Sequence, residues 1–214
     1  MITRQLAGYL ESLLPEQKGH LKEMENYAVE HEVPIMEKTG IDVMLQLLRL
    51  HSSQHILEIG AAIGYSASRM ALALPDAAIL TIEKDAQRYT EATYNIQKLN
   101  LSNRVSVLHG DALETAEQAG SHGSFDVLFI DAAKGQYRRF FEMYEPLLSD
   151  GGMILTDNVL FKGLVAEEEV CIESKRIRSL VKKIKSYNEW LMNHPDYITT
   201  IIPVGDGLAV SMKR

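Results

Sequence analysis

The most informative segment of this chain is His55-Ile-Leu-Glu-Ile-Gly60-Ala-Ala-Ile-Gly64-Tyr-Ser66. It joins a short apolar run to a helical pattern through a loop that two glycines bound. Four further apolar runs of strand length follow, and helical patterns separate them. The strand-like runs are 78–83, 104–108, 125–131 and 152–157, and the helical patterns are 65–74, 84–99, 112–119 and 135–148. This alternation is typical of βαβ units, so we predict a parallel sheet with helices on both faces.

The two ends of the chain extend this pattern. Residues 1–50 carry three amphipathic helical patterns, which predict a helical lead-in to a core over 51–214. At the other end, 197–204 and 208–212 flank Gly205-Asp206-Gly207, a tight turn that predicts an antiparallel hairpin. We therefore predict a single α/β domain with a Rossmann-like, doubly wound sheet of seven strands. The sheet should be mostly parallel with an antiparallel C-terminal strand, so that the tail adds an antiparallel edge.

The composition is that of an ordinary globular protein, with 46% hydrophobic and 24% charged residues. No apolar run reaches the roughly 18 residues that a membrane span needs. The N-terminus lacks the basic and apolar regions of a signal peptide. The single cysteine, Cys171, fits a reducing compartment. We therefore expect a cytoplasmic protein with no membrane partner.

Charge is distributed unevenly along the chain. The net charge of −7 argues against a nucleic-acid partner, yet 174–186 contains six basic residues and no acidic one. These are Lys175, Arg176, Arg178, Lys182, Lys183 and Lys185. On a helix, Ile177, Leu180, Val181 and Ile184 would form an apolar stripe. The basic residues would then cover the outer face, either as a surface that docks phosphate or as a solvated helix face.

Acids and glycines mark the ends of the expected strands. Ligands in open α/β sheets bind outside the carboxyl ends of the strands. Five residues fall at or just after these ends: Gly60, Glu83, Asp111, Asp131 and Asp157. Any one of them could instead cap a helix or make a turn, but five together favour a ligand site.

Two of these acids point to a nucleoside ligand. A carboxylate at Glu83 can accept hydrogen bonds from both ribose hydroxyls, and Asp111 can reach an adenine amino group. The glycine loop itself has the form G-x-x-x-G, which departs from the G-x-G-x-x-G of dinucleotide-binding enzymes. The ribose contact alone would serve NAD and S-adenosylmethionine (SAM) equally.

A second group of polar residues suggests a metal site. Asp131 and Asp157-Asn158 follow two strands that should be neighbours, and neighbouring strands lie roughly 4.7–4.9 Å apart. Two carboxylates and an amide oxygen are hard ligands that suit Mg²⁺. The alternative is that the two aspartates cap helices and Asn158 makes a turn. Lys134, three residues after Asp131, adds an amine to this group.

With Lys134 included, the chain resembles the metal-dependent class I O-methyltransferases, the group of catechol and caffeoyl-CoA O-methyltransferases. The resemblance runs from about Pro34 to the C-terminus. It rests on the glycine loop, Glu83, Gly110-Asp111-Ala112, Asp131-Ala-Ala-Lys134, Asp157-Asn158 and Gly205-Asp206-Gly207. By overall similarity, the chain looks closest to a bacterial branch that methylates 5-hydroxyuridine in tRNA to 5-methoxyuridine.

The resemblance implies SAM and a divalent cation, Mg²⁺ or another, as cofactors. It implies cofactor contacts at Met36, Glu58, Gly60, Gly64, Tyr65, Ser66, Glu83, Asp111, Ala112 and Asp131. It further implies that Asp131, Asp157 and Asn158 bind the metal and that Lys134 acts as the general base. Family members are often dimers, so a homodimer is expected.

The expected function is therefore methylation of the 5-hydroxyl of 5-hydroxyuridine in tRNA, with the basic stretch as a possible RNA contact. The alternative acceptor is a small catechol, a caffeoyl thioester or another vicinal diol, although the extra acidic substrate contact of the catechol enzymes has no counterpart that we can place. Two other classes stay open: a nicotinamide oxidoreductase and a non-catalytic RNA-binding module.

Overall fold

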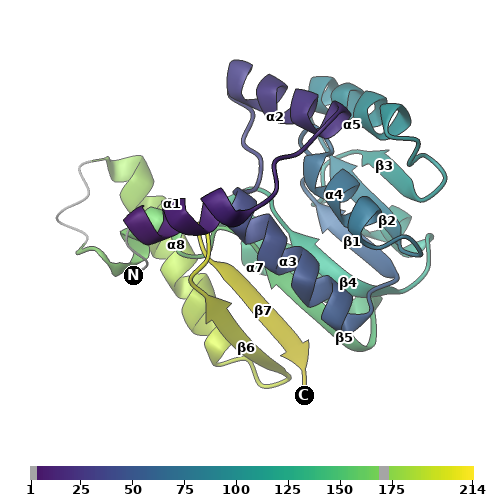
Figure 1. The fold of residues 1–214 in the computed structure, drawn as a ribbon. Coiled ribbons are helices and arrows are strands. Elements are labelled where there is room, and N and C mark those ends of the chain that lie inside the picture. The colour runs from purple at the N-terminus through teal and green to yellow at the C-terminus, as the bar shows by residue number, and fades with distance from the viewer. Residues whose placement is uncertain (1–3, 169–173) are drawn as a thin grey trace.

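The structure, a computed structural model, describes residues 4–168 and 174–214 (Figure 1). One sheet contains seven strands in the order β3-β2-β1-β4-β5-β7-β6. The strands are β1 His55–Ile59, β2 Ala78–Glu83, β3 Val105–His109, β4 Phe125–Ile130, β5 Leu148–Thr156, β6 Tyr197–Ile202 and β7 Leu208–Lys213. Strands β1 to β5 pair in parallel, and β7 runs antiparallel to both of its neighbours. The predicted fold class is confirmed.

The C-terminal tail adds an antiparallel pair of strands at the edge of the sheet, as predicted. Strand β7 lies between β5 and β6, so β6 forms the edge of the sheet. The long helix before β6 carries the chain past the position next to β5. The tight turn after β6 then places β7 in that position. β7 therefore forms hydrogen bonds on both sides, through Leu155↔Val210 on one and Thr200↔Val210 on the other.

Helices cover both faces of the sheet (Figure 1). The α-helices are α1 Arg4–Leu13, α2 His20–Glu30, α3 Lys38–His51, α4 Tyr65–Ala73, α5 Ala86–Lys98, α6 Ala116–Gly120, α7 Tyr137–Tyr144 and α8 Lys175–Met192. Apolar side chains of α2 to α5 pack on one face, and those of α6 to α8 pack on the other. The lead-in helices α2 and α3 thus share a core with the sheet. Among the described residues, no helix is long and apolar enough to cross a bilayer.

Three short 3₁₀ helices lie in segments predicted as helix or loop. They are η1 Lys134–Gln136, η2 Glu145–Leu147 and η3 Phe161–Ala166. The single helix predicted over 135–148 is therefore split, and Pro146 lies in the first turn of η2. The sequence predicts the basic helix from about Glu168, but Glu168 is not helical. The helix begins at Lys175, where the Ser174 hydroxyl caps it. Cys171 and the rest of 169–173 lie outside the described residues.

The strands position the site because their carboxyl ends share one edge of the sheet. The central strands β1 and β4 are buried almost throughout, as expected for strands covered on both faces. The pairs Ile59↔Ile130 and Ile130↔Thr156 bring the last residues of β1, β4 and β5 side by side. The residues that follow these strands must therefore lie close together.

Candidate active site

A cavity of about 760 Å³ opens at this edge of the sheet. The five strand-end residues predicted to meet a ligand all line it: Gly60, Glu83, Asp111, Asp131 and Asp157. Met36, Ala112, Lys134 and Asn158 line it as well. The structure therefore brings most of the predicted site residues together in one cavity.

Gly60 allows the first loop to pass close to β4. Its φ is 104°, and a Cβ there would lie 2.0 Å from the backbone oxygen of Asp131. The Gly60 and Ala61 N–H groups both donate to the carbonyl of Ile82. Any side chain at this position would push the loop away from the strand end. Gly60 therefore holds the cavity wall against the residue predicted to bind metal.

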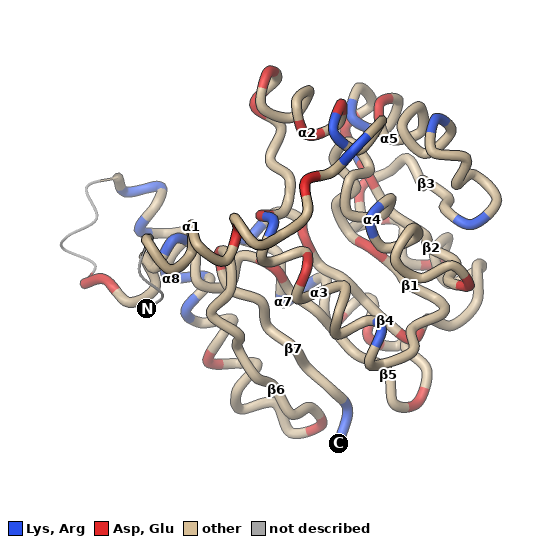
Figure 2. The backbone as a smooth tube through the Cα atoms, in the orientation of Figure 1, with Lys and Arg blue, Asp and Glu red and all other residues tan. Residues whose placement is uncertain are grey.

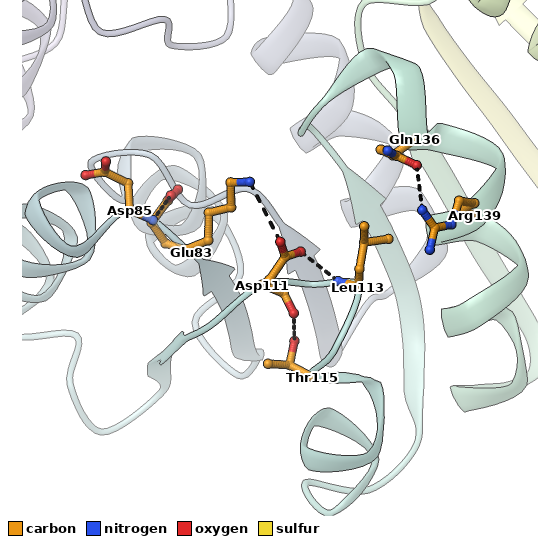
Figure 3. Close-up of polar contacts among 8 residues, drawn as sticks. Glu83, Asp85, Asp111, Leu113, Thr115, Gln136 and Arg139 are labelled. Atoms are coloured by element: carbon orange, nitrogen blue, oxygen red, sulfur yellow. Dashed lines mark hydrogen bonds and ion pairs between the residues drawn. The ribbon is translucent and has the colours of Figure 1, made fainter.

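Glu83 has a fixed orientation in the cavity wall. Its Oε2 accepts the Ala62 N–H at 2.8 Å, and its Oε1 accepts the Asp85 N–H at 2.9 Å. The residue is only 7% exposed. Figure 3 shows the Glu83 carboxylate directed toward the backbone of Asp85. These two bonds leave the remaining lone pairs of a pre-oriented carboxylate for a ligand.

Asp111 follows β3, the strand next to Glu83, and is also held in place (Figure 3). Its Oδ1 accepts the Leu113 N–H at 2.9 Å, and its Oδ2 lies 3.7 Å from the Lys84 ammonium. The Tyr144 hydroxyl donates to the Ala112 carbonyl at 2.8 Å, which anchors the next residue. The positions of Asp111 and Ala112 are therefore fixed at the end of β3.

Four of the predicted cofactor contacts do not line the cavity: Glu58, Gly64, Tyr65 and Ser66. Ser66 turns inward, and its hydroxyl donates to Glu58 Oε1 in a short hydrogen bond. The Tyr65 hydroxyl donates to Glu25 of α2 at 2.8 Å and accepts from Arg69 at 2.9 Å. These residues lie behind the glycine loop and support it.

Glu58 is fully buried, and its second oxygen accepts the Thr81 hydroxyl at 2.5 Å. Burial raises its pKa from 4.5 to about 7, against the opposing effect of the Ser66 and Thr81 hydrogen bonds. The folded state therefore keeps this proton to a higher pH than the unfolded state does. The stability that this gives is complete below pH about 4.5 and is lost as the pH rises to about 7.

Replacing Glu58 by glutamine should remove this pH dependence. At about 1.4 kcal/mol per pKa unit, wild type should lose about 3 kcal/mol more unfolding free energy between pH 4.5 and 7 than the variant. Urea denaturation of both proteins at intervals across this range measures the difference. Other buried carboxyls contribute equally to both proteins and cancel. Parallel stability curves would contradict the assignment.

A second cluster gathers at the ends of β4 and β5. Asp131 directly follows β4, and Asp157, which is 5% exposed, directly follows β5. The Asn158 amide donates to Asp157 Oδ2 at 2.6 Å, so its oxygen is the atom left for a ligand. The Tyr137 hydroxyl donates to the Asp157 backbone carbonyl at 2.9 Å. A buried carboxyl, a half-buried one and an amide oxygen therefore share one end of the cavity.

The electrostatics of this cluster are unusual. Burial raises the pKa of both the Asp131 and Asp157 carboxyls, and the charge of Asp131 raises that of Asp157 further. Burial lowers the pKa of Lys134, although both aspartates favour its charged form. The Lys134 Nζ lies 5.8 Å from the ring centre of Phe161. A lysine with a lowered pKa can act as a proton acceptor near neutral pH.

Sequence reasoning missed part of the cavity wall. Phe161 and Lys162, after β5, and Asp206, in the β6–β7 turn, all line the cavity. The sequence places Asp206 in the turn motif Gly205-Asp206-Gly207 and gives it no role in the site. An antiparallel β7 must begin at the edge where β5 ends, and this consequence of the predicted topology could have revealed it.

Basic residues gather along α8 (Figure 2). Lys175, Arg176, Lys182 and Lys183 are exposed. A Cβ on Gly135 would lie 3.5 Å from Lys183 Cδ and Nζ, so Lys183 packs beside the residue after Lys134. The predicted apolar stripe is buried at Val181 and Ile184, whereas Ile177 is 37% exposed because α8 leaves the core near its N-terminus.

Known proteins are similar to this chain over almost its whole length. A family model described as O-methyltransferase matches residues 12–214. Caffeoyl-CoA O-methyltransferase of Mesembryanthemum crystallinum is 30% identical over 209 residues, which cover 94% of this chain and 82% of the relative.

Solved structures show the same similarity. A putative caffeoyl-CoA O-methyltransferase from Staphylococcus aureus is 38% identical, with a TM-score of 0.91 and coverage of 97% of this chain and 99% of the other. The O-methyltransferase from Bacillus cereus, solved in complex with SAH, is 25% identical, with a TM-score of 0.82 and coverage of 98% and 97%. These matches decide against a nicotinamide oxidoreductase. The chain belongs to the O-methyltransferase family and is a SAM-dependent O-methyltransferase.

Proposed function

We propose that this enzyme methylates one oxygen of a vicinal oxygen pair on a planar acceptor, with a divalent cation and with Lys134 as the proton acceptor. The observation that carries the proposal is the cluster of Asp131, Asp157, Asn158 and Lys134 at one end of a cavity. The other end of that cavity carries the carboxylates of Glu83 and Asp111. We call the end with Glu83 and Asp111 the nucleoside end of the cavity, and the end with Asp131, Asp157, Asn158 and Lys134 the reactive end.

The residues present fit a cation. The carboxyls of Asp131, half-buried, and Asp157, buried, repel each other when both are charged, and a positive charge between them would compensate this. Their oxygens and that of Asn158 suit Mg²⁺, which keeps several waters and uses few protein ligands. Among the described residues, no group of three His, Cys, Asp or Glu side chains could hold a metal. The proposed site uses two carboxylates and one amide oxygen instead.

The chemistry is an in-line displacement at the sulfonium methyl of SAM. The acceptor oxygen forms the new O–CH₃ bond, the S–CH₃ bond breaks, and the acceptor proton passes to the Lys134 Nζ. A bound cation would lower the pKa of the acceptor hydroxyl and orient it. Glu83 holds the ribose of the cofactor, and the Phe161 ring provides an apolar wall next to Lys134.

The acceptor best supported is a catechol ring on a thioester, because curated relatives that match 94% of this chain are caffeoyl-CoA O-methyltransferases. The tRNA acceptor expected from the sequence becomes the second candidate. One observation favours it: the exposed basic residues of α8 include Lys183, which lies beside Gly135, the residue after Lys134. A 5-hydroxyuridine base also presents two adjacent oxygens, so the same reactive end would serve it.

Methyl transfer from labelled SAM separates the two acceptors. Caffeoyl-CoA and a tRNA that carries 5-hydroxyuridine are offered in parallel, at several salt concentrations. Labelling of caffeoyl-CoA supports the proposal. Labelling of the tRNA alone would show that tRNA is the acceptor. Activity on tRNA should then fall steeply as salt rises, because phosphate contacts release counterions.

Glu83→Ala should weaken SAM binding by roughly 10- to 100-fold, since a buried carboxylate gives charge-assisted hydrogen bonds of about 1.5–3 kcal/mol. Isothermal titration with SAM measures the loss. Glu91→Ala, on the helix that follows β2, is the control and should bind SAM as wild type does. Unchanged SAM affinity in Glu83→Ala would remove Glu83 from the cofactor site.

A further inference from the structure

The segment after β5, which we call the acceptor loop (158–163), has an unusual backbone. Asn158, Phe161 and Lys162 have positive φ angles of 63°, 45° and 57°. Gly163 follows with a φ of 80°. Residues other than glycine remain in this left-handed region only where the surrounding structure over-determines their conformation. The acceptor loop therefore needs support from outside itself.

Asp206, in the β6–β7 turn, provides a large part of that support. Its backbone carbonyl accepts the N–H groups of Leu160 and Phe161, at 2.8 and 3.2 Å. Its carboxylate Oδ1 accepts the N–H of Lys162 at 3.2 Å. One residue thus binds three consecutive N–H groups of the loop, and its side chain binds the residue at the left-handed turn.

Gly207 completes the contact. Its carbonyl accepts the Val159 N–H at 3.0 Å, so four consecutive N–H groups of the acceptor loop donate to this turn. The φ of Gly207 is 92°, and a Cβ there would lie 2.4 Å from Leu160 Cγ and 2.8 Å from the Leu160 nitrogen. The loop backbone thus lies directly against the turn, at a distance that only glycine permits.

The loop held in this way carries reactive-end residues. Asn158, Phe161 and Lys162 line the cavity, together with Asp206 itself. We propose that Asp206 and Gly207 are positioning residues, which fix the acceptor loop and through it the orientation of the bound acceptor. This inference rests on the proposed function only in treating this end of the cavity as the acceptor site. It assigns a role to a turn far from the loop in sequence.

Hydrogen–deuterium exchange and steady-state kinetics together test the inference. In Asp206→Ala, the amides of 159–162 should exchange faster, and the KM for the acceptor should rise roughly fivefold, the worth of one hydrogen bond. The Kd for SAM should stay within about twofold, because the loop lies at the other end of the cavity. Asp206→Asn keeps an Oδ1 acceptor and should restore slow exchange and a low KM.

Asp126→Ala is the matched control. Its carboxylate also accepts two backbone N–H groups, those of Gln54 and His55, but it lies outside the cavity. This variant should lose stability without a change in acceptor KM. Gly207→Ala provides a second test, since it should displace Leu160 and raise the acceptor KM more than Asp206→Ala does.

Three results would overturn the inference: unchanged loop exchange in Asp206→Ala, an unchanged acceptor KM in that variant, or an Asp206→Asn variant as impaired as Asp206→Ala. Exchange is measured on the enzyme without an acceptor, so it does not depend on which acceptor is methylated. Wild type that fails to methylate a vicinal oxygen pair would contradict the proposed function instead. The two failures are therefore distinguishable.

Discussion

Lys134→Ala should lower kcat by roughly 100- to 1,000-fold, the usual contribution of a positioned general base. Burial of Lys134 lowers its pKa, although Asp131 and Asp157 favour the charged form, and Lys134 lines the cavity with these two residues. The Kd for SAM should remain close to that of wild type, because Glu83 and Asp111 lie at the opposite end. Single-turnover transfer of a labelled methyl group measures the chemical step, and titration with SAM measures affinity.

Two further variants serve as controls for Lys134→Ala. Lys134→Arg keeps the positive charge but accepts no proton, so it should be nearly as slow as Lys134→Ala. Lys98→Ala, on α5, removes a lysine outside the cavity and should keep full activity. Wild-type turnover in Lys134→Ala would remove Lys134 from the mechanism.

Asp157→Asn should abolish activation by Mg²⁺ and lower kcat at least about 100-fold, because an orienting and activating group for the acceptor hydroxyl is lost. The same variant allows a readout other than activity. A cation that binds only the folded state stabilises it, by about 2.7 kcal/mol at 100 times its Kd. Mg²⁺ should therefore raise the Tm of wild type and leave the Tm of Asp157→Asn unchanged.

Asp150→Asn is the control for this experiment. Asp150 lies near the other end of the same strand, β5, and is exposed. Its replacement should leave both activity and the Mg²⁺-dependent rise in Tm intact. A wild-type Tm that does not respond to Mg²⁺, Mn²⁺ or Ca²⁺ would contradict a cation site at Asp131, Asp157 and Asn158.

Much of the site could be predicted because parallel strands end at one edge of the sheet. Glu83, Asp131 and Asp157 each end or directly follow an apolar run, so the order of residues along the chain already indicates where they lie. The β4–β5 pairing that brings Asp131 and Asp157 together follows from the same topology. The apolar runs and the geometry of a parallel sheet together predict where these three residues lie.

Other features depend on side-chain direction or on long-range pairing. Ser66 lies in the first turn of α4, two residues after Gly64, yet its hydroxyl donates to the buried Glu58 and does not line the cavity. Only the packing around the helix determines this direction. The left-handed backbone of Phe161 and Lys162 has no local signal, because neither residue favours it. The turn at Asp206 stabilises it from more than forty positions away in the chain.

Labelled methyl transfer to a catechol acceptor and to its single-hydroxyl analogue, each with Mg²⁺ and with a chelator, tests the central claim most directly. The proposed mechanism predicts strong labelling of the catechol with Mg²⁺, almost none with the chelator, and weak labelling of the single-hydroxyl compound in both conditions. Equal labelling with and without the cation, or equal labelling of the two acceptors, would contradict metal-dependent transfer to a vicinal oxygen pair.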